Sequence, residues 1–245
     1  MDGLSLRRRI ALDIARSMRK SQEEEHPLRQ LFWECTLRCN LRCQHCGSDC
    51  KQVAATPDMP KEDFFKVLDS IAAKTDPHKV FVIISGGEPT MRADLEECGK
   101  GIYSRGFPWG MVTNGFGMTA ERFSRLLGAG LHSMTVSLDG LEENHDWLRG
   151  REGSFTRAVE TIRMAVQSGI AFDVVTCVNR RNYPQLPQLK EFLIGLGLKE
   201  WRLFSIFPQG RAALNPDLQL PREMFRGMLD FIKETRKEGR IKASY

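Results

Sequence analysis

The sequence lacks any hydrophobic run long enough to cross a membrane. Its longest uninterrupted aliphatic and aromatic run covers residues 80–84, whereas a membrane-spanning helix needs about 20 apolar residues. The first ten residues also lack the apolar stretch of a secretory signal. We therefore predict a cytoplasmic protein without a membrane partner.

Neither sign of charge dominates the chain. Its 36 Lys and Arg residues face 31 Asp and Glu residues, which leaves a formal net charge of +5 spread along the sequence. The one tight basic triplet, at 7–9, is soon followed by an acidic triplet at 23–25. This pattern favours a solvated helix face over a nucleic-acid patch or an anionic-membrane patch, so we predict no nucleic-acid partner.

The chain also lacks the even cysteine count that is typical of a small secreted disulfide scaffold. It has seven cysteines in 245 residues, a number that favours metal binding or redox chemistry in a reducing compartment. With 41% apolar and 27% charged residues, the chain is long enough to bury a full core as one large domain or two small ones.

From residue 28 onward, six short apolar runs alternate with longer amphipathic segments. The apolar runs cover 28–34, 80–84, 109–113, 134–138, 172–178 and 201–207. The amphipathic segments cover 60–74, 94–105, 119–129, 154–168, 185–195 and 221–238. Six strand–helix units in a row predict an α/β fold with a parallel sheet, either doubly wound or part of a (β/α) barrel.

The segment before these units predicts a separate helix over residues 4–25. Its apolar residues fall four apart on one face, at Leu6, Ile10, Ile14 and Met18. The predicted division of the chain is an N-terminal helical extension over 1–27, a main domain over 28–240 and a tail over 241–245.

Glycine and polar residues gather just after the predicted strands. These segments cover residues 85–89, 114–115, 137–140, 179–182 and 208–211. In either architecture, the carboxyl ends of the strands carry the functional site. We therefore predict an enzyme whose site lies at this edge of the sheet.

Five of the seven cysteines fall within sixteen residues, just after the first predicted strand. Cys39, Cys43 and Cys46 have the spacing C-x3-C-x2-C, which lets deprotonated sulfurs converge on a metal centre. A zinc ion would need a fourth ligand from Cys35, Cys50 or His45. A cubane iron–sulfur cluster on three cysteines would instead leave one iron open, as a catalytic metal requires.

The remaining cysteines fit structural roles better than ligand roles. Cys98 and Cys177 fall inside a predicted helix and a predicted strand, where free cysteine behaves as a small buried hydrophobe. Cys35 and Cys50 lie outside the three-cysteine motif. We predict that they are structural thiols as well, with positions that face the cluster as the alternative.

Together with a later Gly-Gly-Glu-Pro segment, the cysteine motif resembles the radical S-adenosylmethionine (radical SAM) superfamily. Three further segments resemble the same superfamily in the same order. They are Thr113-Asn114-Gly115, Val136-Ser137-Leu138-Asp139-Gly140, and His145-Asp146-x-x-Arg149-Gly150 running into Gly153-Ser154-Phe155. Within the superfamily, the chain most resembles SPASM-type peptide and protein maturases, with sulfatase maturases and haem-biosynthesis decarboxylases nearby.

The resemblance implies a partial (β/α)6 TIM-like barrel with two cofactors. Cys39, Cys43 and Cys46 would hold a [4Fe–4S] cluster, whose open iron binds the amino and carboxylate groups of SAM. Reductive cleavage of SAM would then give a 5′-deoxyadenosyl radical that abstracts hydrogen from the substrate. The protein would position these cofactors and exclude water and oxygen.

The resemblance also places Gly86, Gly87, Glu88 and Pro89 against the methionine amino group of SAM. Glycines let backbone groups approach a ligand, and a carboxylate accepts hydrogen bonds from an ammonium group. Without the family, the same four residues would be interpreted as a simple turn.

Five more residues fall at positions that the family uses for SAM. Ser137 and Asp139 match ribose and methionine contacts, although an Asp-Gly pair is also typical of a plain turn. Arg149 is a candidate to pair with the SAM carboxylate, with an exposed ion pair as the alternative. Asn114 is a candidate for the same pocket, and His45 is a candidate to lie beside the adenine.

The C-terminal part departs from the SPASM pattern. No cysteine follows Cys177, so the auxiliary clusters of that group cannot be built in the usual way. We expect a chain cut short before a SPASM region, with 241–245 as the start of that region. The alternative is a short enzyme that uses a single cluster. No catalytic side chain is assigned.

Three functions remain open from the sequence. The leading one is a maturation reaction on a peptide or protein, with electrons supplied by a flavodoxin-type or ferredoxin-type donor. The second is the same radical chemistry on a small molecule, such as a tetrapyrrole or another cofactor precursor. The third is a zinc or iron–sulfur redox module without enzymatic activity.

Overall fold

A single parallel sheet of seven strands, in the order β1 to β7, forms the centre of the molecule. The computed structural model describes residues 5–245, apart from the side chains at positions 22, 24 and 25. Each strand pairs in parallel with the next, so every connection must cross back over the sheet. The strands are β1 (Gln30–Thr36), β2 (Phe81–Gly86), β3 (Trp109–Thr113), β4 (Leu131–Ser137), β5 (Ala171–Val178), β6 (Glu200–Ser205) and β7 (Lys242–Ser244).

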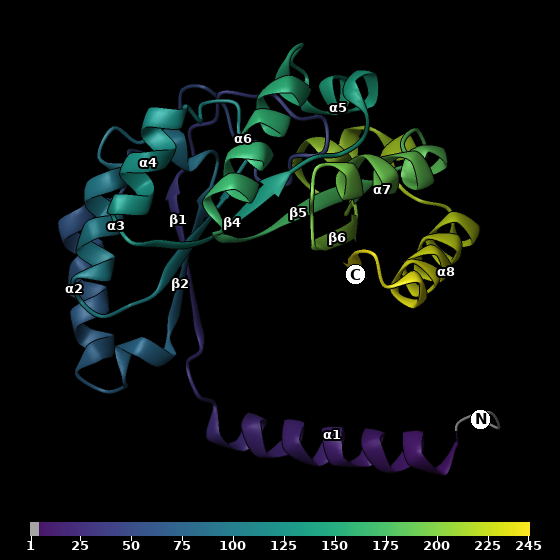
Figure 1. Cartoon of the computed structure of the whole chain (residues 1–245). Coiled ribbons are helices and arrows are strands. Elements are labelled where there is room, and N and C mark those ends of the chain that lie inside the picture. The colour runs from purple at the N-terminus through teal and green to yellow at the C-terminus, as the bar shows by residue number, and fades with distance from the viewer. Residues whose placement is uncertain (1–4) are drawn as a thin grey trace.

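Helices fill the crossovers between the strands and surround the outside of the curved sheet (Figure 1). The α-helices are α1 (Leu6–Glu25), α2 (Lys61–Ala72), α3 (Leu95–Tyr103), α4 (Ala120–Gly128), α5 (Glu142–Arg149), α6 (Ser154–Ser168), α7 (Leu186–Gly195) and α8 (Arg222–Glu238). A doubly wound sheet would reverse its strand order at one point, whereas this order never reverses. Since β1 does not pair with β7 within the described residues, the barrel is open. The predicted partial barrel is confirmed.

Two elements were not expected from the sequence. Residues 241–245, expected as a tail, contain β7, which pairs with β6 and extends the sheet from six strands to seven. Helix α5 was missed because its buried positions are mostly polar. They are Asn144, His145, Leu148 and Arg149, which give no apolar face for a periodicity argument to detect.

The core lies between the sheet and its helices, and Trp109 in β3 is one of its largest fully buried side chains. Its indole Nε1 donates a hydrogen bond to the carbonyl oxygen of Ala129 over 3.2 Å. The ring fits against α3 because Gly99 carries no side chain. A Cβ atom at Gly99 would lie 2.3 Å from the Trp109 ring.

Helix α1 lies apart from the barrel (Figure 1). Its predicted apolar face is not buried: Leu6, Ile10, Ile14 and Met18 are 74%, 51%, 56% and 60% exposed. Among the described residues, no helix is both long enough and apolar enough to span a membrane.

The contact between α3 and Trp109 gives a stability prediction. Gly99→Ala should lower the free energy of unfolding by about 1–3 kcal/mol, because the new methyl group overpacks a rigid indole. The control is Gly128→Ala in α4, where a Cβ atom would meet nothing within 4 Å. That substitution should leave stability unchanged or raise it by up to about 1 kcal/mol. Anaerobic urea unfolding followed by tryptophan fluorescence measures both, and equal midpoints would contradict the proposed packing.

Candidate functional site

A cavity of about 160 Å³ lies at the carboxyl edge of the strands. Its lining comes from the loop after β1, the ends of β2, β3 and β4, helix α5 and the segment after β6. The lining residues are Cys39, Cys43, His45, Cys46, Cys50, Gly86, Gly87, Glu88, Val112, Thr113, Asn114, Ser137, Arg149 and Arg211. Most of the predicted site residues therefore meet in one place, although they are spread over more than one hundred positions of the sequence.

The three motif cysteines reach this cavity on a loop that is fixed at several points. The backbone N–H of Cys39 donates to the carbonyl of Lys51 over 2.8 Å. From beyond β6, the Arg211 Nε donates to the carbonyl of Cys43 over 2.7 Å, and its backbone N–H donates to the carbonyl of Cys46 over 2.9 Å. Arg211 was not predicted as a site residue. The only signal for it was its position after the sixth predicted strand.

Two of the three motif sulfurs receive a side-chain N–H donor. Asn114 Nδ2 lies 3.8 Å from Cys39 Sγ, and Arg149 Nη1 lies 3.7 Å from Cys43 Sγ. Burial raises the pKa of Cys39 to about 12, and it also raises the pKa of Cys43, where Arg149 opposes the shift. A metal bound by these sulfurs would have to displace their protons, and the two donors would stabilise the resulting thiolates.

The motif sulfurs are not gathered as the ligands of a single zinc ion would be. Four thiolates around one zinc at about 2.3 Å would lie about 3.8 Å from one another. Among the described residues, the one group of three or more potential ligands within 4.8 Å of each other is His45, Asp139 and Cys177. That group contains none of the motif cysteines, so their three sulfurs do not all lie within 4.8 Å of one another.

The sequence predicted the same role for Cys35 and Cys50, but the structure places them in different surroundings. Cys35 is fully buried in the core under β1, as expected for a structural thiol. Cys50 instead lines the cavity beside the motif cysteines. Cys98 is a core residue, as predicted.

The two glycines after β2 hold the cysteine loop in place. Gly86 has a φ of 118°, and a Cβ atom there would lie 2.3 Å from the carbonyl oxygen of Thr36. At Gly87 a Cβ atom would lie 2.2 Å from the carbonyl oxygen of Arg38. The backbone N–H groups of Gly87 and Glu88 donate to these same carbonyls over 2.7 and 2.9 Å. The close approach that requires glycine is therefore to the chain's own backbone, although both glycines also line the cavity.

Glu88 is buried, and both of its carboxylate oxygens already accept hydrogen bonds. Oε1 accepts from the backbone N–H and hydroxyl of Thr90 and from the hydroxyl of Thr113, over 3.2, 2.8 and 2.7 Å. Oε2 accepts from the backbone N–H of Asn114 over 2.8 Å. Burial raises the pKa of Glu88, and these donors partly offset the rise. Glu88 thus joins the ends of β2 and β3 and fixes the backbone of Asn114.

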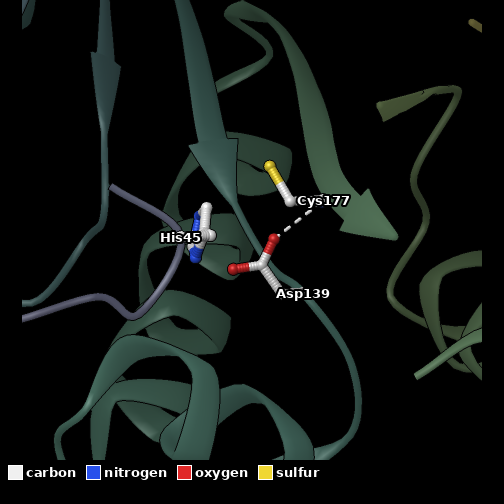
Figure 2. Close-up of side chains that lie close together, drawn as sticks. All are labelled: His45, Asp139 and Cys177. Atoms are coloured by element: carbon white, nitrogen blue, oxygen red, sulfur yellow. Dashed lines mark hydrogen bonds between the residues drawn. The ribbon is translucent and has the colours of Figure 1, made fainter. Parts of the chain in front are cut away.

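Asp139 forms a buried ion pair with Arg149. Arg149 Nε donates to Asp139 Oδ2 over 2.6 Å, while the backbone N–H of Cys177 donates to Oδ1 over 2.8 Å. Burial alone would raise the pKa of Asp139, but the Arg149 guanidinium holds it below its usual range. Figure 2 shows His45, Asp139 and Cys177 directed toward one another. Arg149 already neutralises Asp139. We therefore describe His45 and Cys177 as neighbours of an ion pair, and not as ligands of a metal.

Two histidines near this ion pair are neutral. Burial lowers the pKa of His45 and of His145 to about 4 in each case. His45 lines the cavity, and its Nδ1 is buried without a hydrogen-bond partner. An unpartnered ring nitrogen beside the motif cysteines suits a bound polar ligand. His145 Nδ1 accepts a hydrogen bond from the backbone N–H of Asp139 over 3.0 Å and so fixes that residue.

Of the remaining predicted residues, some line the cavity and others lie outside its lining. Ser137 lines the cavity, whereas Pro89 and Asp139 do not. Pro89 begins the short 3₁₀ helix η2 (Pro89–Met91). Cys177, predicted as a plain core thiol, has its sulfur within 4.8 Å of ligand atoms of His45 and Asp139. Its strand position gave no signal of that proximity.

Comparison with known proteins agrees with this geometry. The model of the Radical SAM superfamily matches residues 33–193. The AdoMet-dependent heme synthase of Oleidesulfovibrio alaskensis is 28% identical over 91% of this chain and 57% of its own length. The Fe-coproporphyrin III synthase of Methanosarcina barkeri is 31% identical over 84% of this chain and 51% of its own. The PqqA peptide cyclase of Rhizobium meliloti is 26% identical over 80% and 52%. The chain thus spans about half the length of these relatives.

Solved structures share the fold at lower sequence identity. The enzyme anSMEcpe with bound AdoMet and Kp18Cys peptide has a TM-score of 0.73 at 16% identity, over 88% of this chain and 63% of its own. SuiB from Streptococcus suis, bound to precursor peptide SuiA, has a TM-score of 0.67 at 16% identity, over 96% and 53%. At such identities the likeness concerns the fold alone.

The neutral state of His145 gives a prediction about pH. An unfolded histidine titrates near pH 6.5, so between about pH 6.5 and 4 the unfolded chain binds a proton that the folded chain excludes. The free energy of unfolding should therefore fall as the pH drops through this window, by up to about 3 kcal/mol from His145. In His145→Asn, whose side-chain oxygen can still accept from Asp139, this part of the loss should disappear.

Urea unfolding at pH 7.5 and at pH 4.5 measures this effect. The same substitution at the exposed His132 is the control. If His145→Asn and the parent lose the same stability between the two pH values, then His145 is not the excluded site.

Proposed function

Because the chain belongs to the radical SAM superfamily of enzymes, we propose that it removes hydrogen from a small substrate of the tetrapyrrole class. The observation that carries this proposal is the identity of 28% and 31% to heme and coproporphyrin synthases, over most of this chain. These relatives support the small-molecule alternative better than the peptide substrate that the motifs alone favoured. We assign the activity to the barrel, from β1 to β7.

The cofactors of this family are SAM and a [4Fe–4S] cluster. In this chain, Cys39, Cys43 and Cys46 would hold the cluster, since all three line one cavity. When bound, the two cofactors supply a 5′-deoxyadenosyl radical that abstracts hydrogen from substrate. The loop that carries the cysteines is kept in place by Arg211 and by the backbone after β2.

On the SAM side, we propose that His45, Asn114 and Ser137 contact the ligand, because their polar side chains line the cavity. Glu88 and Asp139 act as positioning residues instead. Each is buried and already engaged, Glu88 by the residues that follow β2 and β3 and Asp139 by Arg149. This differs from the direct SAM contacts that the family resemblance implied for both carboxylates.

A peptide substrate is the second candidate. It is supported by the 26% identity to PqqA peptide cyclase and by the likeness of the fold to two peptide-bound enzymes. The sequence relatives that act on tetrapyrroles are more similar, and a shared barrel fold does not determine the substrate.

Substrate-dependent cleavage of SAM tests the proposal. With the anaerobically reconstituted protein, a low-potential reductant and SAM, an iron coproporphyrin should raise the rate of 5′-deoxyadenosine formation at least about tenfold over the substrate-free rate. Cys43→Ala should abolish this reaction, whereas Cys98→Ala, in the core, should retain most of it. Stimulation by a PqqA-type peptide but not by the porphyrin would replace the tetrapyrrole with a peptide. Equal loss in the two cysteine variants would contradict the assigned cluster ligands.

The hydrogen bond from Asn114 to Cys39 gives a separate prediction. A donor to a cluster sulfur stabilises the more negative, reduced state, so Asn114→Leu should lower the reduction potential by about 20–60 mV. Titration monitored by electron paramagnetic resonance measures this shift. The control is Gln167→Leu, which removes an exposed side-chain amide on α6, away from the cysteine loop. A shift of the same size in both variants would show that the effect does not come from the sulfur contact.

A further inference from the structure

A second cavity lies beside the cysteine loop and is lined by positive charge. It has a volume of about 480 Å³, and its lining includes Arg42, Lys51 and Arg151 but no carboxylate. We call it the basic groove. It shares one lining residue, Cys39, with the interior cavity. Cys39, a predicted cluster ligand, therefore lies between the basic groove and the interior cavity.

The charges of the basic groove are exposed and largely unneutralised. Arg42, Lys51 and Arg151 are all exposed. Lys51 lies 3.2 Å from Asp49, and both side chains of that pair are largely solvated, at 66% and 46% exposure. For Arg42 and Arg151, the described part of the chain provides no ion-pair partner within 4.0 Å. The groove thus keeps a local excess of positive charge, although the chain as a whole is close to balanced.

The groove is also attached firmly to the cysteine loop. Lys51 accepts a backbone hydrogen bond from Cys39 over 2.8 Å. The backbone of Arg42 lies so close to Gly150 that a Cβ atom on Gly150 would come within 2.6 Å of its carbonyl oxygen. The Arg151 guanidinium lies over the Phe116 ring at 4.7 Å. These contacts hold the backbone that carries Arg42 and Lys51, and the Arg151 side chain, at a fixed position relative to Cys39.

We propose that the basic groove is the docking surface for an acidic one-electron donor protein of the flavodoxin or ferredoxin type. This inference rests on the proposed function, which requires a reduced cluster. With the cluster held by Cys39, Cys43 and Cys46, the donor would be oxidised by one electron and the cluster would be reduced by one. No atom or proton crosses the interface.

Charge and geometry both favour this occupant. Weak redox complexes have small interfaces, and complementary charge steers their encounter. The exposed Val53, 81% accessible, supplies an apolar contact at the rim. A substrate in the groove would be separated by the cysteine loop from Asn114 and Ser137, which line the interior cavity instead.

Charge reversal in the groove tests the proposal. In Arg42→Glu/Arg151→Glu, the second-order rate of cluster reduction by a photoreduced acidic flavodoxin should fall at least tenfold at low salt. The rate for the parent should itself fall as salt is added. Arg163→Glu/Lys233→Glu, which makes the same change in net charge on exposed positions of α6 and α8, should keep the parental rate. Stopped-flow absorbance on the reconstituted holoenzyme measures these rates.

Two further measurements separate docking from damage to the site. Reduction by photoexcited deazaflavin, a small molecule, should give the same cluster signal in all three proteins, and SAM should change that signal equally. Equal flavodoxin rates in the groove variant and its control would overturn the docking surface while leaving the proposed function intact. Loss of porphyrin turnover with an unchanged flavodoxin rate would assign the groove to the substrate and overturn the inference. A parent without a [4Fe–4S] signal would overturn the proposed function, and the docking inference with it.

Discussion

The buried ion pair between Arg149 and Asp139 connects the parts of the chain that form the site. Arg149 ends α5, Asp139 follows β4, and the Asp139 carboxylate also accepts the backbone N–H of Cys177 in β5. The same guanidinium reaches the sulfur of Cys43 on the loop after β1. A buried charge that loses its partner costs about 3–5 kcal/mol, so none of these segments can move away alone. The pair therefore fixes the distance between the cysteine loop and the distal strands.

Glu88 has the corresponding role on the other side of the cavity, by different means. Its carboxylate is held by hydroxyl and backbone donors of Thr90, Thr113 and Asn114 rather than by a cation. The pKa values therefore move in opposite directions: burial raises that of Glu88, whereas Arg149 lowers that of Asp139. Both carboxylates are used to hold backbone and side chains in place. This use explains why both acidic residues are buried from solvent, Glu88 in the cavity lining and Asp139 behind it.

Much of the fold could be predicted because six of the seven strands coincide with short segments rich in apolar residues and most helices have an apolar face. The cysteine triplet was equally easy to recognise, since its spacing alone indicates a shared metal centre. Helix α5 was not predicted because it buries polar residues. The positions of Arg211 and Cys177 at the site were not predicted because only tertiary contacts bring them there. Gly86 and Gly87 line the cavity, as predicted site residues should, but their close neighbours in the structure are backbone atoms of the chain itself. A sequence shows that a glycine is needed, but it does not show whether the close neighbour is a ligand or the chain's own backbone.

The cysteine loop thus has two sides with different electrostatics. On the inner side, the charge of Arg149 is balanced by Asp139, and the space is lined by neutral groups such as His45 and Asn114. On the outer side, Arg42 and Arg151 have no acidic partner among the described residues and stay in solvent. Unpaired cations on a surface increase the rate of encounter with an acidic protein, whereas unpaired cations in a buried site would be costly. Cys39 lines both cavities, and its backbone N–H bonds to Lys51 of the basic groove, so a single residue connects the two sides of the loop.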